Sequence, residues 1–129
     1  MIHVVDTHPL IWHLENWRGL GENASRILTS SPDRLIVPTI VLAEARYIIA
    51  KKRRSVTWGE LLSFVLGDLR FVIHDLDVDI VSNLPHDLEM HDAIICATVL
   101  SYQEASGDPV PLITKDRQIR ESGLVQTVW

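Results

Sequence analysis

Two acidic residues follow short apolar runs closely. Asp6 comes immediately after Ile2 to Val5, and Asp116 lies one residue beyond the run 112–114. Such runs are typical of buried parallel strands, and ligands of open α/β sheets bind outside the carboxyl ends of the strands. The two carboxylates are therefore expected at one edge of a sheet, where they could act together.

Two further acids are expected on helices. Asp92 begins the pattern of a helix that is apolar around most of its girth, so its carboxylate lies near the positive end of that helix. Glu44 is four residues from both Ile40 and Ile48, and this spacing places it on their inward face. An inward carboxylate is costly unless it is paired, protonated or bound to a metal.

Each acid also has a purely structural interpretation. Asp116 could cap a short final helix, Asp92 could be a first-turn residue favoured by the helix dipole, and Asp6 could end its strand in a turn. Glu44 could form a buried salt bridge with a nearby Arg or Lys. Four acids that converge on one sheet edge nevertheless favour one shared site over four separate roles.

The chemistry of such a site is narrow. Ligation by oxygen alone suits Mg²⁺ or Mn²⁺, and without a cation several carboxylates would repel one another and take up protons. With one or two ions bound, the site could activate water and stabilise the charge of a phosphodiester displacement. The chain has no GxGxxG, no Walker-type GK[ST] and no HExxH among its six histidines.

The elements that position these acids are expected to alternate. Strands are predicted at 2–5, 35–37, 71–73, 111–114 and 125–128, and helices at 9–14, 23–28, 39–54, 57–69, 79–84, 92–104 and 117–122. Pro9 is expected at the first position of its helix, and Thr57 with Glu60 fits a capping box. This order predicts one α/β domain over residues 1–129, with a central parallel sheet of four to five strands and helices on both faces.

Composition narrows the functional class. The 129 residues are 47% apolar and carry a formal charge of −5, which argues against a general basic nucleic-acid binder but not against a nuclease that loads cations. Cys96 is the only cysteine, so no intrachain disulfide can form, and we expect it to be an inert apolar residue. No signal peptide or membrane span is expected, and the chain is interpreted as cytoplasmic.

Four segments of the chain resemble the motif blocks of PIN-domain proteins, and more narrowly VapC-like toxins of VapBC type II toxin–antitoxin pairs. They are VVDTHPLIWHL from Val4, VLAEARYI from Val41, HDAIICATVL from His91 and PLITKD from Pro111. The resemblance covers nearly the whole chain and implies a PIN-like fold and a Mg²⁺- or Mn²⁺-dependent endoribonuclease. It implies that the metal-holding catalytic acids are Asp6, Glu44, Asp92 and Asp116.

The resemblance also implies supporting residues and partners. Thr7 and Thr114 match positions whose hydroxyls orient a carboxylate or a metal-bound water, whereas His91 gains no role from it. In the family pattern a metal-activated water cleaves RNA to leave a 5′-phosphate and a 3′-hydroxyl. Such toxins usually form homodimers, and a small VapB-like antitoxin, which commonly also binds DNA, silences them by crossing the active-site groove.

Several basic and aromatic residues have two interpretations. Lys51 lies near the face of Glu44, and Lys115 and Arg117 flank Asp116, so all three are candidates for RNA phosphate contacts. Lys51 could equally belong to a solvated helix end. The four tryptophans are scattered and not interleaved with basic residues, so they are interpreted as core or interface anchors rather than as base-stacking platforms.

Two other functions remain open. The chain could be a non-catalytic PIN-like regulatory module, although the presence of all four acids argues against a degenerate site. A phosphoacceptor signalling domain would share the α/β sheet, an acid at a strand end and a late Thr-Lys pair at Thr114 and Lys115. Such a domain should also carry an acidic pair after the first strand, where this chain has Thr7 and His8.

Overall fold

The computed structural model describes all residues, 1–129, and alternates strands with helices as predicted. The elements are β1 (Ile2–Val5), α1 (Thr7–Leu14), α2 (Glu22–Ser30), β2 (Arg34–Pro38), α3 (Thr39–Lys52), α4 (Trp58–Gly67), β3 (Phe71–His74), α5 (Val78–Ser82), α6 (Met90–Ser106), β4 (Leu112–Ile113), α7 (Arg117–Ser122) and β5 (Thr127–Val128). None of the helices is long and apolar enough to cross a membrane.

The five strands form one parallel sheet in the order β3-β2-β1-β4-β5. Val4 in the central strand pairs with Ile36 of β2 on one side and with Leu112 of β4 on the other. The chain builds outward from β1 through β2 and β3, then returns to add β4 and β5 at the opposite side. The strand order therefore reverses between β1 and β4, which is where open α/β sheets bind ligands.

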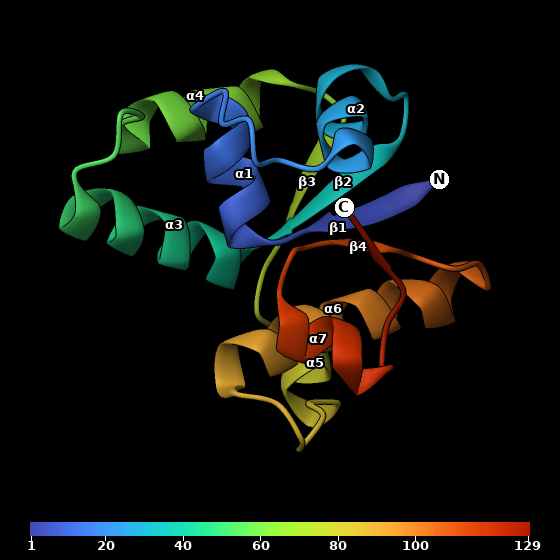
Figure 1. Cartoon of the computed structure of the whole chain (residues 1–129). Coiled ribbons are helices and arrows are strands. Elements are labelled where there is room, and N and C mark those ends of the chain that lie inside the picture. The colour runs from blue at the N-terminus through green and yellow to red at the C-terminus, as the bar shows by residue number, and fades with distance from the viewer.

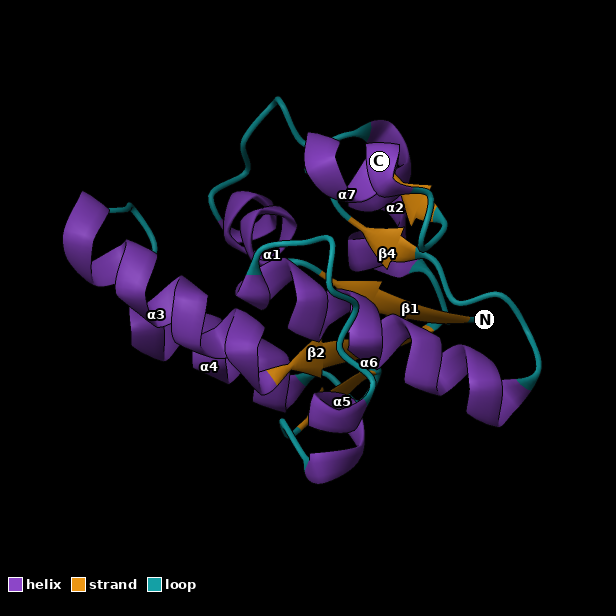
Figure 2. Cartoon of the chain, turned by 90° about the horizontal axis from the view of Figure 1, so that it is seen from below, coloured by secondary structure: helices purple, strands orange, loops and turns teal.

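Helices cover both faces of this sheet. In Figure 1, α1, α2 and α4 lie on one side of the strands, and α5, α6 and α7 lie on the other. Figure 2 shows α3 running outward from the end of β2, with α4 returning beside it. The predicted class, a single α/β domain with a parallel sheet between two helical layers, is confirmed.

The core lies between β1, β2, β4 and the helices packed on them. Val4, Ile36 and Ile113 are fully buried strand residues, and Ile95 and Val99 of α6 are fully buried against them. Each such side chain contributes about 1.5–3 kcal/mol through its removal from water. This packing holds the carboxyl ends of β1 and β4 rigidly beside the start of α6.

Two helices, α1 and α6, begin two residues earlier than predicted. α1 begins at Thr7 and not at Pro9, because the Asp6 carboxylate caps it. Pro9 is tolerated as the third helical residue since the first four N–H groups of a helix have no intrahelical partner. α6 begins two residues before Asp92, at Met90, after the Glu89 N-cap. Asp92 is thus a first-turn residue, as its dipole-based interpretation requires.

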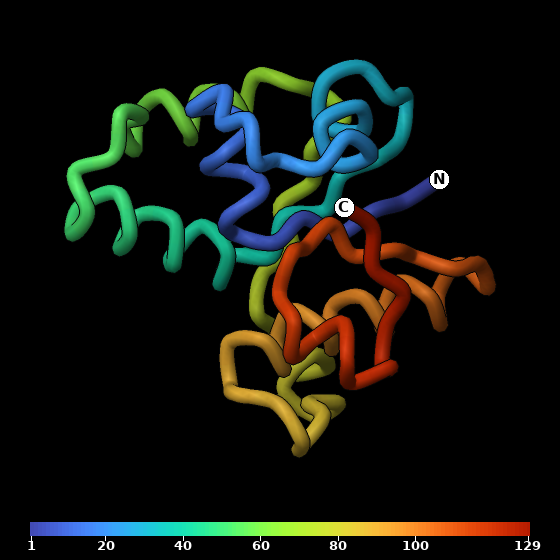
Figure 3. The backbone as a smooth tube through the Cα atoms, viewed as in Figure 1, coloured from blue at the N-terminus to red at the C-terminus, as the bar shows by residue number.

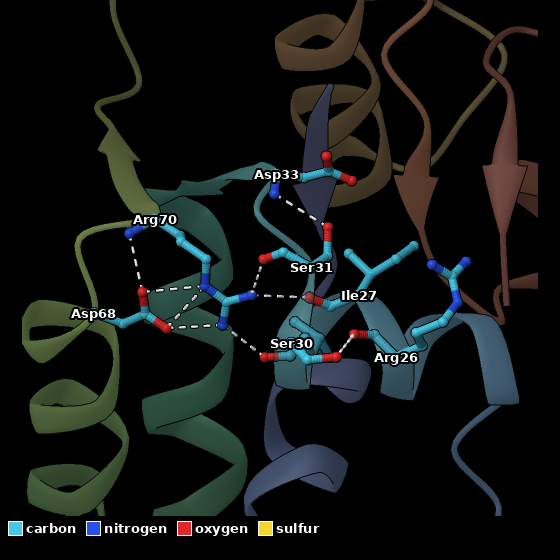
Figure 4. A network of polar contacts seen from close by, with 8 residues as sticks. Arg26, Ile27, Ser30, Ser31, Asp33, Asp68 and Arg70 are labelled. Carbon is cyan, nitrogen blue, oxygen red and sulfur yellow. Dashed lines mark hydrogen bonds and ion pairs between the residues drawn. The ribbon is translucent and has the colours of Figure 1, made fainter.

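A cluster of polar contacts around Arg70 joins the end of α2 to the residues just before β3 (Figure 4). The Arg70 guanidinium donates to the backbone oxygens of Ile27, Leu28 and Ser31 at distances of 3.1, 2.8 and 2.7 Å. It also pairs with the Asp68 carboxylate: Nε donates to Oδ1 at 3.2 Å and to Oδ2 at 3.1 Å, and Nη2 donates to Oδ2 at 2.8 Å. These bonds satisfy carbonyls that the end of α2 leaves without helical partners.

Candidate active site

Asp6 and Asp116 meet where the sheet order reverses. In Figure 3 the tube passes along β1 into α1 and along β4 toward α7, with both strand ends on the same side of the molecule. The Asp6 backbone N–H donates to the Ile113 carbonyl at 3.1 Å, which joins the two strand ends directly. The Asp6 Oδ1 atom accepts from the Thr7 N–H at 2.7 Å and caps α1.

Thr114 connects the Asp6 carboxylate with the Asp116 backbone. Its side chain is fully buried, and its hydroxyl donates to Asp6 Oδ2 at 2.7 Å. The Thr114 Oγ1 atom in turn accepts from the Asp116 backbone N–H at 2.9 Å. The Asp116 Oδ1 atom accepts from the Ile119 N–H at 2.9 Å, so this acid also caps α7, as its structural interpretation expected.

Glu44 reaches the site from α3 without an Arg or Lys partner. Its Oε1 atom accepts from the Thr7 hydroxyl at 3.0 Å, and Oε2 lies 3.3 Å from Nδ1 of His91. The interpretation of Glu44 as one half of a buried Arg or Lys salt bridge is therefore wrong, since a hydroxyl and an imidazole hold it. Arg46 instead lies over the Trp58 ring, at 5.4 Å from its centroid, away from this carboxylate.

His91 is a site residue that sequence reasoning missed. It lies in the first turn of α6 and faces both Glu44 and Glu89, whose Oε1 atom is 3.8 Å from its Nδ1. No local signal could have found it, because the contact depends on how α3 packs against α6.

Asp92 lies within electrostatic reach of the other three acids. Burial, followed by the charges of Asp116, Asp6, Glu89 and Glu44, raises the pKa of Asp92 from 3.8 to about 6. Burial is also the largest cause that raises the pKa of Asp6, and of Glu44. No positive side chain offsets this repulsion in an ion pair with Asp6, Asp92 or Asp116. The site therefore carries negative charge that a cation would neutralise.

The donor set fits a hard divalent cation by its chemistry, although not as a preformed cage. As the side chains stand, no three His, Cys, Asp or Glu residues are grouped closely enough to hold a metal ion together. Asp6 is engaged by Thr7 and Thr114, and Asp116 caps α7. Mg²⁺ usually keeps several waters and uses one or two carboxylates directly, so a complete protein cage is not required.

A pocket of about 290 Å³ opens beside Asp6 and Asp116, and Lys115 also lines it. The other two basic candidates lie differently. Lys51 at the end of α3 lies over the Tyr47 ring, and Arg117 pairs with Glu121 at 2.7 Å on the exposed side of α7. A larger pocket of about 530 Å³ lies at the opposite, amino edge of the sheet. That pocket is remote from all four acids.

Cys96 lies in the core below the site and takes no part in it. Burial, followed by the charges of Asp92, Asp6 and Asp116, raises the pKa of its thiol to about 12. A protonated, buried thiol is unreactive, which agrees with the interpretation of this residue as a small apolar group.

Comparison with known proteins identifies the fold family. The PIN domain family model matches residues 3–123. A toxin–antitoxin complex from Klebsiella pneumoniae contains a chain with 21% identity and a TM-score of 0.67, matched over 98% of this chain and 96% of that one. A chain of VapBC2 from Rickettsia felis, in a complex with a DNA fragment from its promoter, has 14% identity and a TM-score of 0.66. The match covers 99% of this chain and 98% of that one.

Mycobacterium tuberculosis VapC20, described as a sarcin–ricin loop cleaving toxin, has 16% identity and a TM-score of 0.62, with coverage of 95% and 96%. Among curated proteins, none matches the chain significantly. Identities this low show a shared fold, whereas the family match spans nearly every element from β1 to α7. The chain belongs to the PIN domain family.

Proposed function

We propose that this PIN domain is a Mg²⁺- or Mn²⁺-dependent endoribonuclease and the toxin of a type II toxin–antitoxin pair. One observation carries the proposal: Asp6, Glu44, Asp92 and Asp116 gather at the reversal of the strand order, and no Lys or Arg forms an ion pair with them. Repelling carboxylates cost stability, and a cation-dependent activity is the simplest use that offsets this cost.

In this proposal the four carboxylates hold the cation, which when bound supplies an activated water and a positive charge beside the scissile phosphate. The protein orients the ligands. The Thr114 hydroxyl fixes Asp6, and the Thr7 hydroxyl fixes Glu44. His91 holds the second oxygen of Glu44, and its charge when protonated would favour the ionised carboxylate. Lys115, beside Asp116, is the basic side chain best placed to contact a phosphate.

Arg117 and Lys51 are weaker candidates for RNA contacts under this proposal. Arg117 is exposed and would have to exchange Glu121 for a phosphate. Lys51 is exposed at the end of α3, where it would meet RNA only beyond the immediate site.

The proposed partners follow from the comparisons and from the surface. Two of the similar structures are described as toxin–antitoxin or VapBC complexes, which supports a VapB-like antitoxin as partner. Three large apolar side chains are exposed on α3, on α4 and just after α4: Tyr47, Leu66 and Leu69. Exposed apolar residues of this kind are expected where an antitoxin or a second copy of the chain covers the surface.

Cleavage of a mixed RNA pool by the partner-free chain tests the proposal. Discrete cuts are expected with Mn²⁺, and none with chelator or with Asp92→Asn. Asp108→Asn removes an exposed acid near the amino edge of the sheet and should cleave like the wild type. Cleavage that survives chelator and Asp92→Asn would refute the proposal.

Two outcomes would favour the alternative functions. A folded chain that binds its antitoxin but cuts no RNA would indicate a regulatory PIN module. A stable mass increase of one phosphate after incubation with a small phosphodonor would indicate a phosphoacceptor domain.

A further inference from the structure

Three of the four tryptophans come together beside the acidic site. Trp12 lies on α1, Trp17 in the segment that follows it, and Trp129 just beyond β5. The Trp12 ring centroid is 4.4 Å from that of Trp17 and 5.7 Å from that of Trp129. These three residues, scattered in the sequence, therefore form one aromatic cluster in the structure.

Two glycines make room for this cluster. A Cβ atom at Gly19 would overlap the Trp17 ring, and one at Gly21 would overlap Trp129. The Asn23 side-chain amide donates to the Trp129 backbone oxygen at 3.2 Å. The rings are thus seated on backbone, and a ligand that stacks on them would meet a surface already arranged. Trp17 remains 44% exposed, so part of this surface is open to solvent.

A positive charge lies over the same rings. Lys115 Nζ is 5.5 Å from the Trp17 centroid and 5.7 Å from the Trp129 centroid, within the range of a cation–π contact. The His8 ring centroid lies 5.1 Å from that of Trp12. The cluster therefore combines flat aromatic faces with one flexible, exposed ammonium group.

One pocket joins this cluster to the carboxylates. The 290 Å³ pocket is lined by Asp6 and Asp116 together with His8, Trp12 and Lys115. Trp17 also lines a second pocket, of about 480 Å³, with the exposed Arg18 and Arg26. Cationic side chains thus flank the rings both next to the acids and away from them.

We propose that the cluster of Trp12, Trp17, Trp129 and Lys115 is a nucleobase-stacking site that positions single-stranded or loop RNA. This inference rests on the proposed nuclease function and names its substrate class. An unstacked base lies against the indoles, and Lys115 pairs with the adjoining phosphate. The neighbouring phosphodiester is then held beside Asp6 and Asp116. Paired RNA is disfavoured, because its bases are already stacked.

The charge pattern favours RNA over a protein partner at this place. A basic peptide side chain that approached the rings would meet Lys115, which already lies over two of them. A nucleotide satisfies both features at once, because its base is flat and apolar on its face and its phosphate is anionic.

Binding of a fluorescein-labelled, mixed-sequence oligoribonucleotide tests the site, with cleavage blocked by Asp92→Asn in every protein. Trp17→Leu should weaken binding roughly 5- to 150-fold, the range that corresponds to the loss of one stacked base. Trp17→Phe should restore most of it. Trp58→Leu is the matched control, because Trp58 lies on α4 against Arg46 of α3, outside the cluster, and it should bind like the parent. Lys115→Gln should lower the salt dependence of binding by about one counterion.

The two proposals can fail separately. Unchanged affinity in folded Trp17→Leu, or an equal loss in Trp58→Leu, overturns the stacking site whatever the nuclease result. A duplex that binds as tightly as the single strand also overturns it. In the cleavage-competent chain, Trp17→Leu should raise KM more than it lowers kcat. If Trp17 governs binding but no protein cleaves RNA, the stacking site stands and the nuclease proposal fails.

Discussion

Replacement of Asp92 by Asn should stabilise the metal-free protein at neutral pH. Asp92 is half-buried beside Asp6, Asp116 and Glu44, and its ionised form is disfavoured by burial and by those charges. Asn keeps nearly the same shape and removes one charge from the cluster. If Asp92 served only to stabilise its helix, Asp92→Asn would instead lower the stability of the protein, since loss of a first-turn acid weakens a helix.

The magnitude follows from the pKa of Asp92. A rise from 3.8 to about 6 corresponds to about 3 kcal/mol at ~1.36 kcal/mol per pKa unit. Partial exposure and salt screening reduce this, and the loss of the favourable dipole contact reduces it further, so a gain of about 1–2 kcal/mol is expected. Because the folded pKa is the higher one, wild-type stability falls as pH rises from about 4 to about 6 and stays lowered above that.

Urea unfolding of both proteins in chelator, at pH 7.5 and near pH 3.5, measures this difference. The gain should be present at pH 7.5 and nearly absent at the lower pH, where the carboxyl is mostly protonated in both states. Asp108→Asn, an exposed acid outside the cluster, should change stability by less than about 0.5 kcal/mol. An Asp92→Asn protein that is equally or less stable than wild type at pH 7.5 would refute the argument from repulsion.

Three further outcomes are expected. Arg70→Ala should lower the free energy of unfolding by about 2–4 kcal/mol, because it leaves three carbonyls near the end of α2 without donors. The control Arg120→Ala, at an exposed residue, should change it by less than about 0.5 kcal/mol. Equal effects of the two substitutions in urea unfolding would contradict this. Hydrogen bonds from Arg70 lower the pKa of Asp68, so the stability from this pair is present above the unfolded pKa and is lost as pH falls through the folded one; Asp68→Asn should flatten that part of the stability–pH curve. Thr114→Val removes the hydroxyl that holds Asp6 and should reduce RNA cleavage roughly 10- to 100-fold with unchanged circular dichroism; full activity would contradict its orienting role.

The sheet edge and its two acids could be predicted because each depends on local pattern and one topological rule. Apolar runs mark β1 and β4, and parallel strands present their carboxyl ends together, which places Asp6 with Asp116. Glu44 was predictable from its spacing with Ile40 and Ile48. Helix boundaries were less accurate, because the start of α1 depends on the side chain of Asp6 and not on Pro9.

Contacts between distant elements could not be predicted in the same way. His91 meets Glu44 only because α3 packs against α6, and neither residue carries a local signal of the other. The aromatic cluster brings Trp12 and Trp17 to Trp129, which lies at the far end of the sequence. The position of Lys115 over these rings could not be predicted from basic residues near the tryptophans in the sequence. Lys115 follows β4, whereas Trp17 follows α1 and Trp129 follows β5.

The claim that the four carboxylates share a cation site is tested most directly by Mn²⁺ binding to the purified chain, followed through the paramagnetic resonance signal of free Mn²⁺. The account predicts saturable binding that Asp92→Asn weakens at least tenfold and that Asp108→Asn leaves unchanged, with Mg²⁺ competing for the same site. Absence of binding by the folded wild type, or equal binding by wild type and Asp92→Asn, would contradict it.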